Sequence, residues 1–176
     1  MSDIYRLATL DDAEELLGVI LRAYETIREL GINFPAAYAD IEMVRDTVAN
    51  HECYVLVRDG AIIATVTISE PVEQLKAIAD FPFIMKFAVE PAFKGQGVGN
   101  CLLTWVEEDI ARGKWKAEAV TLGTAERHPW LVQMYERRGY ERIYELETVD
   151  DGKMVLLKKQ LTRSEQSLGE TMIVLT

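Results

Sequence analysis

Residues 90–100 read Glu90-Pro91-Ala92-Phe93-Lys94-Gly95-Gln96-Gly97-Val98-Gly99-Asn100, a glycine-rich loop between an apolar run and an amphipathic segment. The run before the loop, residues 83–89, is rich in aromatic and β-branched side chains that favour a strand, and Pro91 stops a helix from crossing the turn. After the loop, apolar residues recur at helical spacing on one face, and polar residues occupy the other. The apolar face is formed by Val98, Leu102, Trp105, Val106 and Ile110, and the polar face by Glu107, Glu108 and Arg112, with Gly113 as the stop signal. The sequence predicts a strand, a tight loop and a helix.

This strand-to-helix junction has the chemistry of an anion site. The first N–H groups of a helix lack partners and carry partial positive charge. Glycines at 95, 97 and 99 let a phosphate approach the backbone, although three glycines also suit a plain tight turn. The Walker form is excluded, because Asn100 and Cys101 follow Gly99, and the spacing also fails the dinucleotide-binding pattern.

Two motifs carry a resemblance to a known family. Lys94-Gly95-Gln96-Gly97-Val98-Gly99 resembles the Arg/Gln-x-x-Gly-x-Gly/Ala signature of the GCN5-related N-acetyltransferase (GNAT) family, with Lys94 in the place of Arg or Gln. Residues 128–140 resemble the later motif of that family, with three departures from its usual residues. His128 replaces Asn, Leu131 replaces Ala and Tyr140 replaces Phe.

The resemblance implies a single-domain α/β (α+β) fold, with a mixed central sheet of six to seven strands splayed in the middle and about four helices. It implies acetyl-coenzyme A as cosubstrate and no metal. The pantetheine arm would lie along the backbone of Phe87, Ala88 and Val89. The remaining cofactor contacts would come from Lys94, Gly95, Gln96, Gly97, Val98, Gly99, Asn100 and His128.

The resemblance also assigns catalytic roles. The Val89 N–H would polarise the acetyl carbonyl, and Tyr135 would donate a hydrogen bond to the departing thiolate. A free tyrosine is a weaker acid than a thiol, so a hydrogen bond is the safer role than full proton transfer. The general base stays open: His128 is first a helix-start or cofactor contact and only second a base. Glu70, Glu73, Glu90 and a water chain are the other options.

Composition supports one globular domain, predicted over residues 1–161, followed by a tail over 162–176 that suits an extra strand, a dimer contact or a frayed end. The 176 residues are 49% apolar and 27% charged, with a net charge of −10. This charge argues against nucleic acid or an anionic membrane as partner. Two interpretations of the charge stay open: it attracts cationic substrates, or it only aids solubility. Without a signal peptide or a membrane-spanning run, the expected location is the cytosol, where Cys53 and Cys101 would be free, buried thiols.

The rest of the chain supplies local start and stop signals. Thr9 and Asp12 form a capping pair before a first helix that runs toward Gly31, and a second helix is predicted over residues 38–50. Asp59-Gly60 predicts a hairpin between strands 53–57 and 61–68, and Asp151-Gly152 predicts another between 142–147 and 154–158. A further strand is predicted over 119–124, and a last helix begins at Pro129 and is capped by Gly139. Phe34, Tyr38 and Asp40 are candidates to contact the acceptor.

The predicted function is acetyl transfer from acetyl-coenzyme A to a primary amine, by direct attack in a ternary complex. The sequence leaves the acceptor open among a polyamine, an amino-sugar, an amino acid, and a peptide or protein amine. A non-catalytic coenzyme A-binding sensor is the alternative, and transfer to a hydroxyl would share every motif. A homodimer stays open.

Overall fold

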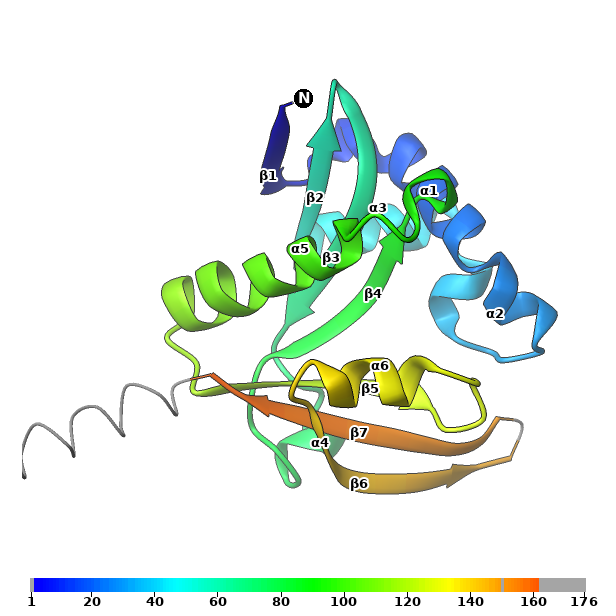
Figure 1. Ribbon diagram of the computed structural model, residues 1–176, viewed down its shortest axis with the longest axis vertical. Coiled ribbons are helices and arrows are strands. Elements are labelled where there is room, and N and C mark those ends of the chain that lie inside the picture. Colours follow the sequence, from blue (N-terminus) through cyan, green and yellow to red (C-terminus); the bar gives the residue numbers. More distant parts are fainter. Residues whose placement is uncertain (1, 150, 162–176) are drawn as a thin grey trace, which may run out of the picture.

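The computed structural model describes residues 2–149 and 151–161, and its centre is a seven-stranded sheet of order β1-β2-β3-β4-β5-β7-β6 (Figure 1). Neighbouring strands are antiparallel except β4 and β5. The predicted mixed sheet and both predicted hairpins are confirmed, while the tail over 162–176 lies outside the described residues. The strands are β1 (Asp3–Leu7), β2 (Glu52–Arg58), β3 (Ala61–Ser69), β4 (Phe83–Val89), β5 (Ala119–Ala125), β6 (Glu141–Thr148) and β7 (Gly152–Gln160).

Six α-helices accompany the sheet in the described part of the chain, so the expectation of about four was too low. The first predicted helix is divided at Tyr24, whose backbone leaves helical geometry, and the loop after β3 holds one extra turn. The second predicted helix begins three residues later than expected, because Asp40 is its N-cap and accepts from the Met43 N–H at 2.9 Å. The helices are α1 (Ala13–Ala23), α2 (Glu25–Glu29), α3 (Ile41–Asn50), α4 (Glu73–Lys76), α5 (Val98–Trp105) and α6 (Leu131–Arg137).

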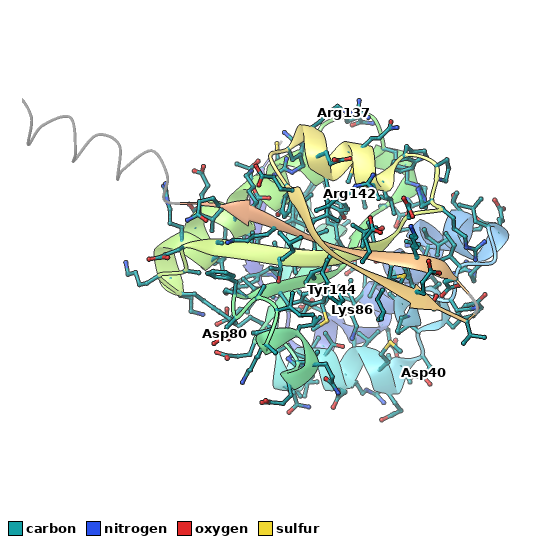
Figure 2. All side chains as sticks on the ribbon, turned by 90° about the horizontal axis from the view of Figure 1, so that it is seen from below. Asp40, Asp80, Lys86, Arg137, Arg142 and Tyr144 are labelled. Carbon is teal, nitrogen blue, oxygen red and sulfur yellow. The ribbon has the colours of Figure 1, made fainter. Side chains whose placement is uncertain are left out.

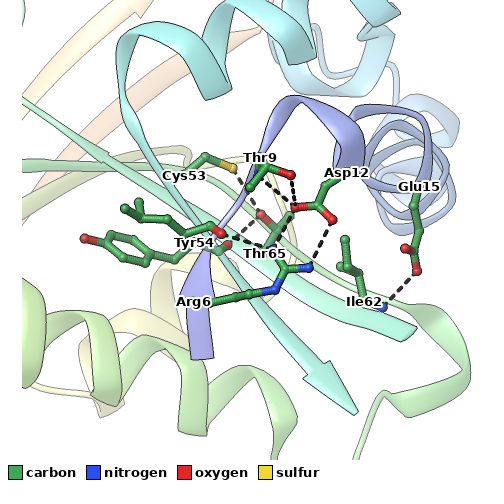
Figure 3. A network of polar contacts seen from close by, with 9 residues as sticks. Arg6, Thr9, Asp12, Glu15, Cys53, Tyr54, Ile62 and Thr65 are labelled. Atoms are coloured by element: carbon green, nitrogen blue, oxygen red, sulfur yellow. Dashed lines mark hydrogen bonds and ion pairs between the residues drawn. The ribbon is translucent and has the colours of Figure 1, made fainter. Parts of the chain in front are cut away.

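The start of α1 is fixed to the sheet by polar contacts (Figure 3). The predicted capping pair forms, since the Asp12 carboxylate accepts from the Thr9 N–H at 2.7 Å. The same carboxylate accepts two hydrogen bonds from Arg6 of β1, at 2.7 and 3.0 Å. One turn later, Glu15 accepts from the Ile62 N–H of β3 at 2.9 Å. These contacts hold α1 in place, and with it the Tyr24 side chain at its C-terminal end.

The sheet opens between β4 and β5. Only two residue pairs join these strands, Phe83 with Thr121 and Ile84 with Leu122, and beyond them the strands diverge (Figure 1). The divergence coincides with a β-bulge in β4: Lys86 has φ +53°, and the register with β3 shifts at this point. A bulge bends its strand and locally disrupts the ladder. The predicted splayed sheet therefore has a local backbone cause.

Two details of the helix after the glycine loop differ from expectation. The helix continues past Gly113 as a π-helical segment, η4 (Val106–Lys114), and Glu107, predicted to be on the polar face, is only 1% exposed. The wider turn of a π-helix rotates side chains away from regular helical spacing, so the 3.6-residue pattern misplaced Glu107. Cys53 is buried as expected, but Cys101 is exposed.

Candidate active site

A cavity of about 620 Å³ lies where β4 separates from β5. The glycine loop and the start of α5 line it. The α1–α2 junction and the turn at Phe34–Ala36 line it as well. The walls are formed by β4, the middle of β5 and the start of α6. Opening a sheet in its middle thus creates a passage bounded by segments that are distant in sequence.

The cavity brings together the residues that the two sequence motifs predicted. Eleven of the twelve predicted site residues line it, and only Gln96 does not. Gln96 is exposed, and its side-chain amide donates to the Ala92 carbonyl at 3.4 Å. The lining residues are Phe87, Ala88, Val89, Lys94, Gly95, Gly97, Val98, Gly99, Asn100, His128 and Tyr135.

The three glycines of the loop meet different steric requirements. Gly95 and Gly97 both have φ +79°, in the left-handed region, and Gly97 is the N-cap of α5. A Cβ atom on either would meet no atom within 4 Å, so their space is open. A Cβ on Gly99 would lie 2.9 Å from Phe87 and 3.0 Å from Val89, so Gly99 allows α5 to pack closely on β4. Backbone conformation and packing together leave the loop amides accessible.

Gly97→Val is expected to weaken coenzyme A binding about tenfold, measured by calorimetry. A β-branched residue in the left-handed region is strained by about 1–2 kcal/mol, and its side chain would stand over the loop amides. Gly60→Val is the matched control, because Gly60 has φ +82° with open space around it, in the β2–β3 turn away from the cavity. The control should lose similar stability but no affinity. Equal affinity in the two variants would contradict a cofactor role for the loop.

The end of β4 turns backbone groups toward the opening. The Glu90 N–H donates to the Ile63 carbonyl of β3 at 2.8 Å, and Val89 pairs with Ala64. Because hydrogen-bonded and non-hydrogen-bonded pairs alternate along an antiparallel ladder, the Val89 N–H points away from β3. The Phe87 carbonyl also turns away from β3, and it accepts from the Tyr24 hydroxyl at 3.0 Å. Tyr24 thereby holds the strand just after its bulge.

Tyr135 lies in α6 and its side chain is 8% exposed. Burial raises the pKa of Tyr135 to about 12, so its hydroxyl keeps its proton at neutral pH and remains a donor. Its ring packs edge-on against Tyr140, with the ring centroids 5.6 Å apart. The position suits a donor of a hydrogen bond into the cavity.

His128 is 4% exposed and lies at the start of α6. Its Nδ1 accepts from the backbone N–H groups of Trp130 and Leu131, at 3.4 and 3.3 Å. Burial lowers the pKa of His128, and the positive charge of Lys94 lowers it further. The ring is therefore neutral with its proton on Nε2, an arrangement that leaves Nδ1 occupied and unsuited to act as a base. Because His128 organises this turn, α6 begins at Leu131, two residues after Pro129.

The other residues proposed from the sequence differ in whether they line the cavity. Phe34 lines the cavity, whereas Tyr38 and Asp40 do not. The acidic candidates also lie outside its lining: Glu90 pairs with Arg22 at 2.7 Å, and Glu73 pairs with Lys76 at 3.2 Å. Glu70 likewise does not line the cavity.

The lining residues that were not singled out from the sequence include Tyr24 and Lys86, whose polar groups make hydrogen bonds to other elements. Lys86 carried a readable signal, because it is the one charged residue in the apolar run 83–89. Tyr24 carried no such signal, because an aromatic side chain on the apolar face of a helix is typical of a core residue.

Comparisons with known proteins agree with this geometry. The family model described as "Acetyltransferase (GNAT) family" matches residues 19–140. The S-alkylcysteine N-acetyltransferase of Bacillus subtilis (strain 168) is 49% identical over 150 residues, which cover 85% of this chain and 84% of the relative. The S-(2-succino)cysteine N-acetyltransferase of the same organism is 47% identical over 161 residues, covering 92% and 98%.

Solved structures show the same fold at low identity. A GNAT-family acetyltransferase from Streptococcus agalactiae superposes with a TM-score of 0.74 at 18% identity, covering 90% of this chain and 95% of that chain. The PaiA N-acetyltransferase from Thermoplasma acidophilum, in complex with coenzyme A, gives a TM-score of 0.70 at 15% identity, covering 91% and 99%.

Residues 2–149 and 151–161 contain no group of three His, Cys, Asp or Glu side chains placed to hold a metal ion. In the same ranges, no helix has the length and hydropathy needed to cross a membrane. The motifs, the opened sheet and the two relatives at nearly half identity together show that the chain belongs to the GNAT family of acyl-coenzyme A-dependent acetyltransferases.

Proposed function

We propose that this enzyme transfers an acetyl group from acetyl-coenzyme A to the α-amine of an S-substituted cysteine. The observation that carries the proposal is the near-half identity, over most of the chain, to two relatives that are both named for N-acetylation of such cysteines. The two free cysteines, Cys53 and Cys101, suit a reducing compartment such as the cytosol, where acetyl-coenzyme A would be supplied.

The charge of the cavity supports this acceptor over a polyamine. The whole chain carries −10, which by itself would suit a cationic substrate. In the described part of the chain, however, no Asp or Glu lines the cavity, while Lys86 and Lys94 do. A polyamine would find no carboxylate partner there, whereas an amino acid brings a carboxylate of its own. Local charge, not net charge, decides which ligand is stabilised.

The lining of the cavity also suits a thioether. Phe34, Met85, Trp130 and Met154 contribute aromatic and sulfur-containing side chains to the lining. Methionine and aromatic groups adapt to irregular apolar ligands and make favourable contacts with sulfur. This lining accommodates apolar S-substituents of different shapes.

The proposed chemistry uses one group at the end of β4 and one in α6. The neutral amine attacks the acetyl carbonyl carbon, and the Val89 N–H stabilises the negative charge that develops on oxygen. The tetrahedral intermediate then breaks its C–S bond, and coenzyme A leaves as a thiolate that accepts a hydrogen bond from Tyr135. The amine proton passes to water, since the cavity lining of the described chain offers no carboxylate base. An α-amine is generally less basic than a lysine side chain, so a larger neutral fraction is available without a strong base.

The test is thiol release from acetyl-coenzyme A with a defined acceptor panel. S-Methylcysteine, S-benzylcysteine and S-(2-succino)cysteine are expected to react at least about tenfold faster, in kcat/KM, than spermidine, glucosamine or a lysine peptide. Mass spectrometry should place the acetyl group on nitrogen. N-Acetyl-S-benzylcysteine, whose amine is blocked, is the matched control and should release no thiol.

Two outcomes would overturn the proposal. Binding of coenzyme A without release for any acceptor would support a non-catalytic sensor. Release with spermidine but not with cysteine derivatives would replace the acceptor class.

A further inference from the structure

Lys86 is a charged side chain in the wall of an otherwise apolar strand. Its side chain, labelled in Figure 2, reaches from β4 to α3. Its backbone has φ +53° at the β4 bulge, and its side chain is half-buried. Its Nζ donates to the Thr47 hydroxyl of α3 at 2.7 Å.

The Lys86 ammonium has a neutral partner where a buried cation ordinarily has a carboxylate. Among the described residues no Asp or Glu lies within ion-pair distance of it. The polar groups around it are the neutral side chains of Thr47, Cys53, Thr65 and Thr67, and Asp46 is farther away. Burial lowers the pKa of Lys86, because the charged form is poorly solvated there. A bound anion would relieve this desolvation.

Other partly buried cations of the chain are paired with a carboxylate. Lys159 and Arg138 both contact the Glu107 carboxylate, at 2.8 and 2.9 Å. These two cations have a partner built into the fold. Lys86 has no carboxylate partner among the described residues, and it is one of the residues that line the cavity.

Lys86 lies in the same strand as Val89, and both residues line the cavity. Lys86 reaches α3 and, with Ala36, borders a second small space between α1, α3 and the sheet. It is three residues before Val89, a separation of at most about 10 Å along an extended strand. A lysine side chain spans much of that distance.

Resting on the proposed function, we propose that Lys86 binds the α-carboxylate of the cysteine acceptor, with its Nζ turning from Thr47 into the cavity. The α-carboxylate is one carbon away from the reacting amine, so this contact fixes the amine near the Val89 amide. It makes the enzyme selective for free amino acids over amides, peptides and polyamines. Lys86 is thus a specificity-determining residue.

The test compares S-benzylcysteine with S-benzylcysteinamide, which lacks only the carboxylate charge. The wild-type protein should prefer the acid by about tenfold to 150-fold in kcat/KM, the range of a hydrogen bond to a charged group. Lys86→Met should reduce this preference to within about twofold, by loss of the acid reaction alone, and Lys86→Arg should restore most of it. Affinity for coenzyme A should stay unchanged in both variants.

Lys76→Met is the matched control, because Lys76 lies on α4 outside the cavity and pairs with Glu73 at the surface. It should keep the wild-type preference. Lys86→Gln, which retains a donor toward Thr47, replaces Lys86→Met if the latter does not fold.

The outcomes separate the two proposals. Equal losses on acid and amide in Lys86→Met, or no preference for the acid in the wild type, would overturn the role of Lys86 and leave the acceptor class standing. No thiol release with any cysteine derivative would overturn both.

Discussion

Tyr135→Phe is expected to lower kcat about a hundredfold while changing acetyl-coenzyme A affinity less than twofold. The substitution removes one hydroxyl and keeps the ring that packs on Tyr140. A hydrogen bond to sulfur strengthens only as the C–S bond breaks, so its loss falls on the transition state and not on binding. The magnitude is at the lower end for a positioned proton donor, as expected for a hydrogen bond without full proton transfer. Steady-state kinetics and calorimetry measure the two quantities.

The pH profile tests the same role from another direction. Burial raises the pKa of Tyr135 to about 12, and a raised pKa means that the protonated, donating form persists to higher pH. Wild-type kcat should therefore show no loss assigned to Tyr135 below about pH 11. Tyr144, labelled in Figure 2, lies on β6 and does not line the cavity, so Tyr144→Phe should leave kcat unchanged. A kcat equal to wild type in Tyr135→Phe would reduce Tyr135 to a packing side chain.

Glu107→Ala is expected to lower the free energy of unfolding by about 3–5 kcal/mol, the range for breaking a buried ion pair. The Glu107 carboxylate accepts from the Tyr140 hydroxyl at 2.6 Å, Lys159 at 2.8 Å and Arg138 at 2.9 Å. Its removal leaves two partly buried cations facing each other and one buried hydroxyl without an acceptor. Urea unfolding, followed by the midpoint at constant slope, measures the loss.

Glu108→Ala is the matched control, because Glu108 is the next residue of η4 and is exposed. It should change stability by less than about 0.5 kcal/mol. The double variant Glu107→Leu with Lys159→Met should recover part of the loss, since it removes an unpaired charge along with the carboxylate. Similar stabilities for Glu107→Ala and Glu108→Ala would show that the buried cluster contributes little to folding.

The sequence by itself determined the elements whose cause is local. Residues 83–89 were predicted as a strand and are β4 to the residue. Asp59 and Gly60 both have positive φ, as the predicted turn requires, and Gly139 ends α6 with φ +98°. These features depend on the dihedral preferences of single residues and on the pattern of side chains along a short segment. The residues that determine them lie within a few positions of each other in the chain.

Most of the residues of the glycine loop that line the cavity could also be predicted from the sequence. The two motifs have fixed internal spacing, and both match the family they resemble. The residues of each motif are close together in the chain, so two short stretches of sequence supply most of these lining residues.

Only the tertiary structure decided the features whose partners are distant. Glu107 looked like a surface residue, yet its three partners come from 31 to 52 positions away, in the segments after α6 and in β7. Tyr24 meets the Phe87 carbonyl across 63 positions, and Lys86 meets Thr47 across 39. The net charge of −10 even suggested a cationic acceptor, while the described cavity lining has lysines and no carboxylates. Burial and local electrostatics depend on which segments come into contact. Those contacts are set by the packing of the whole chain.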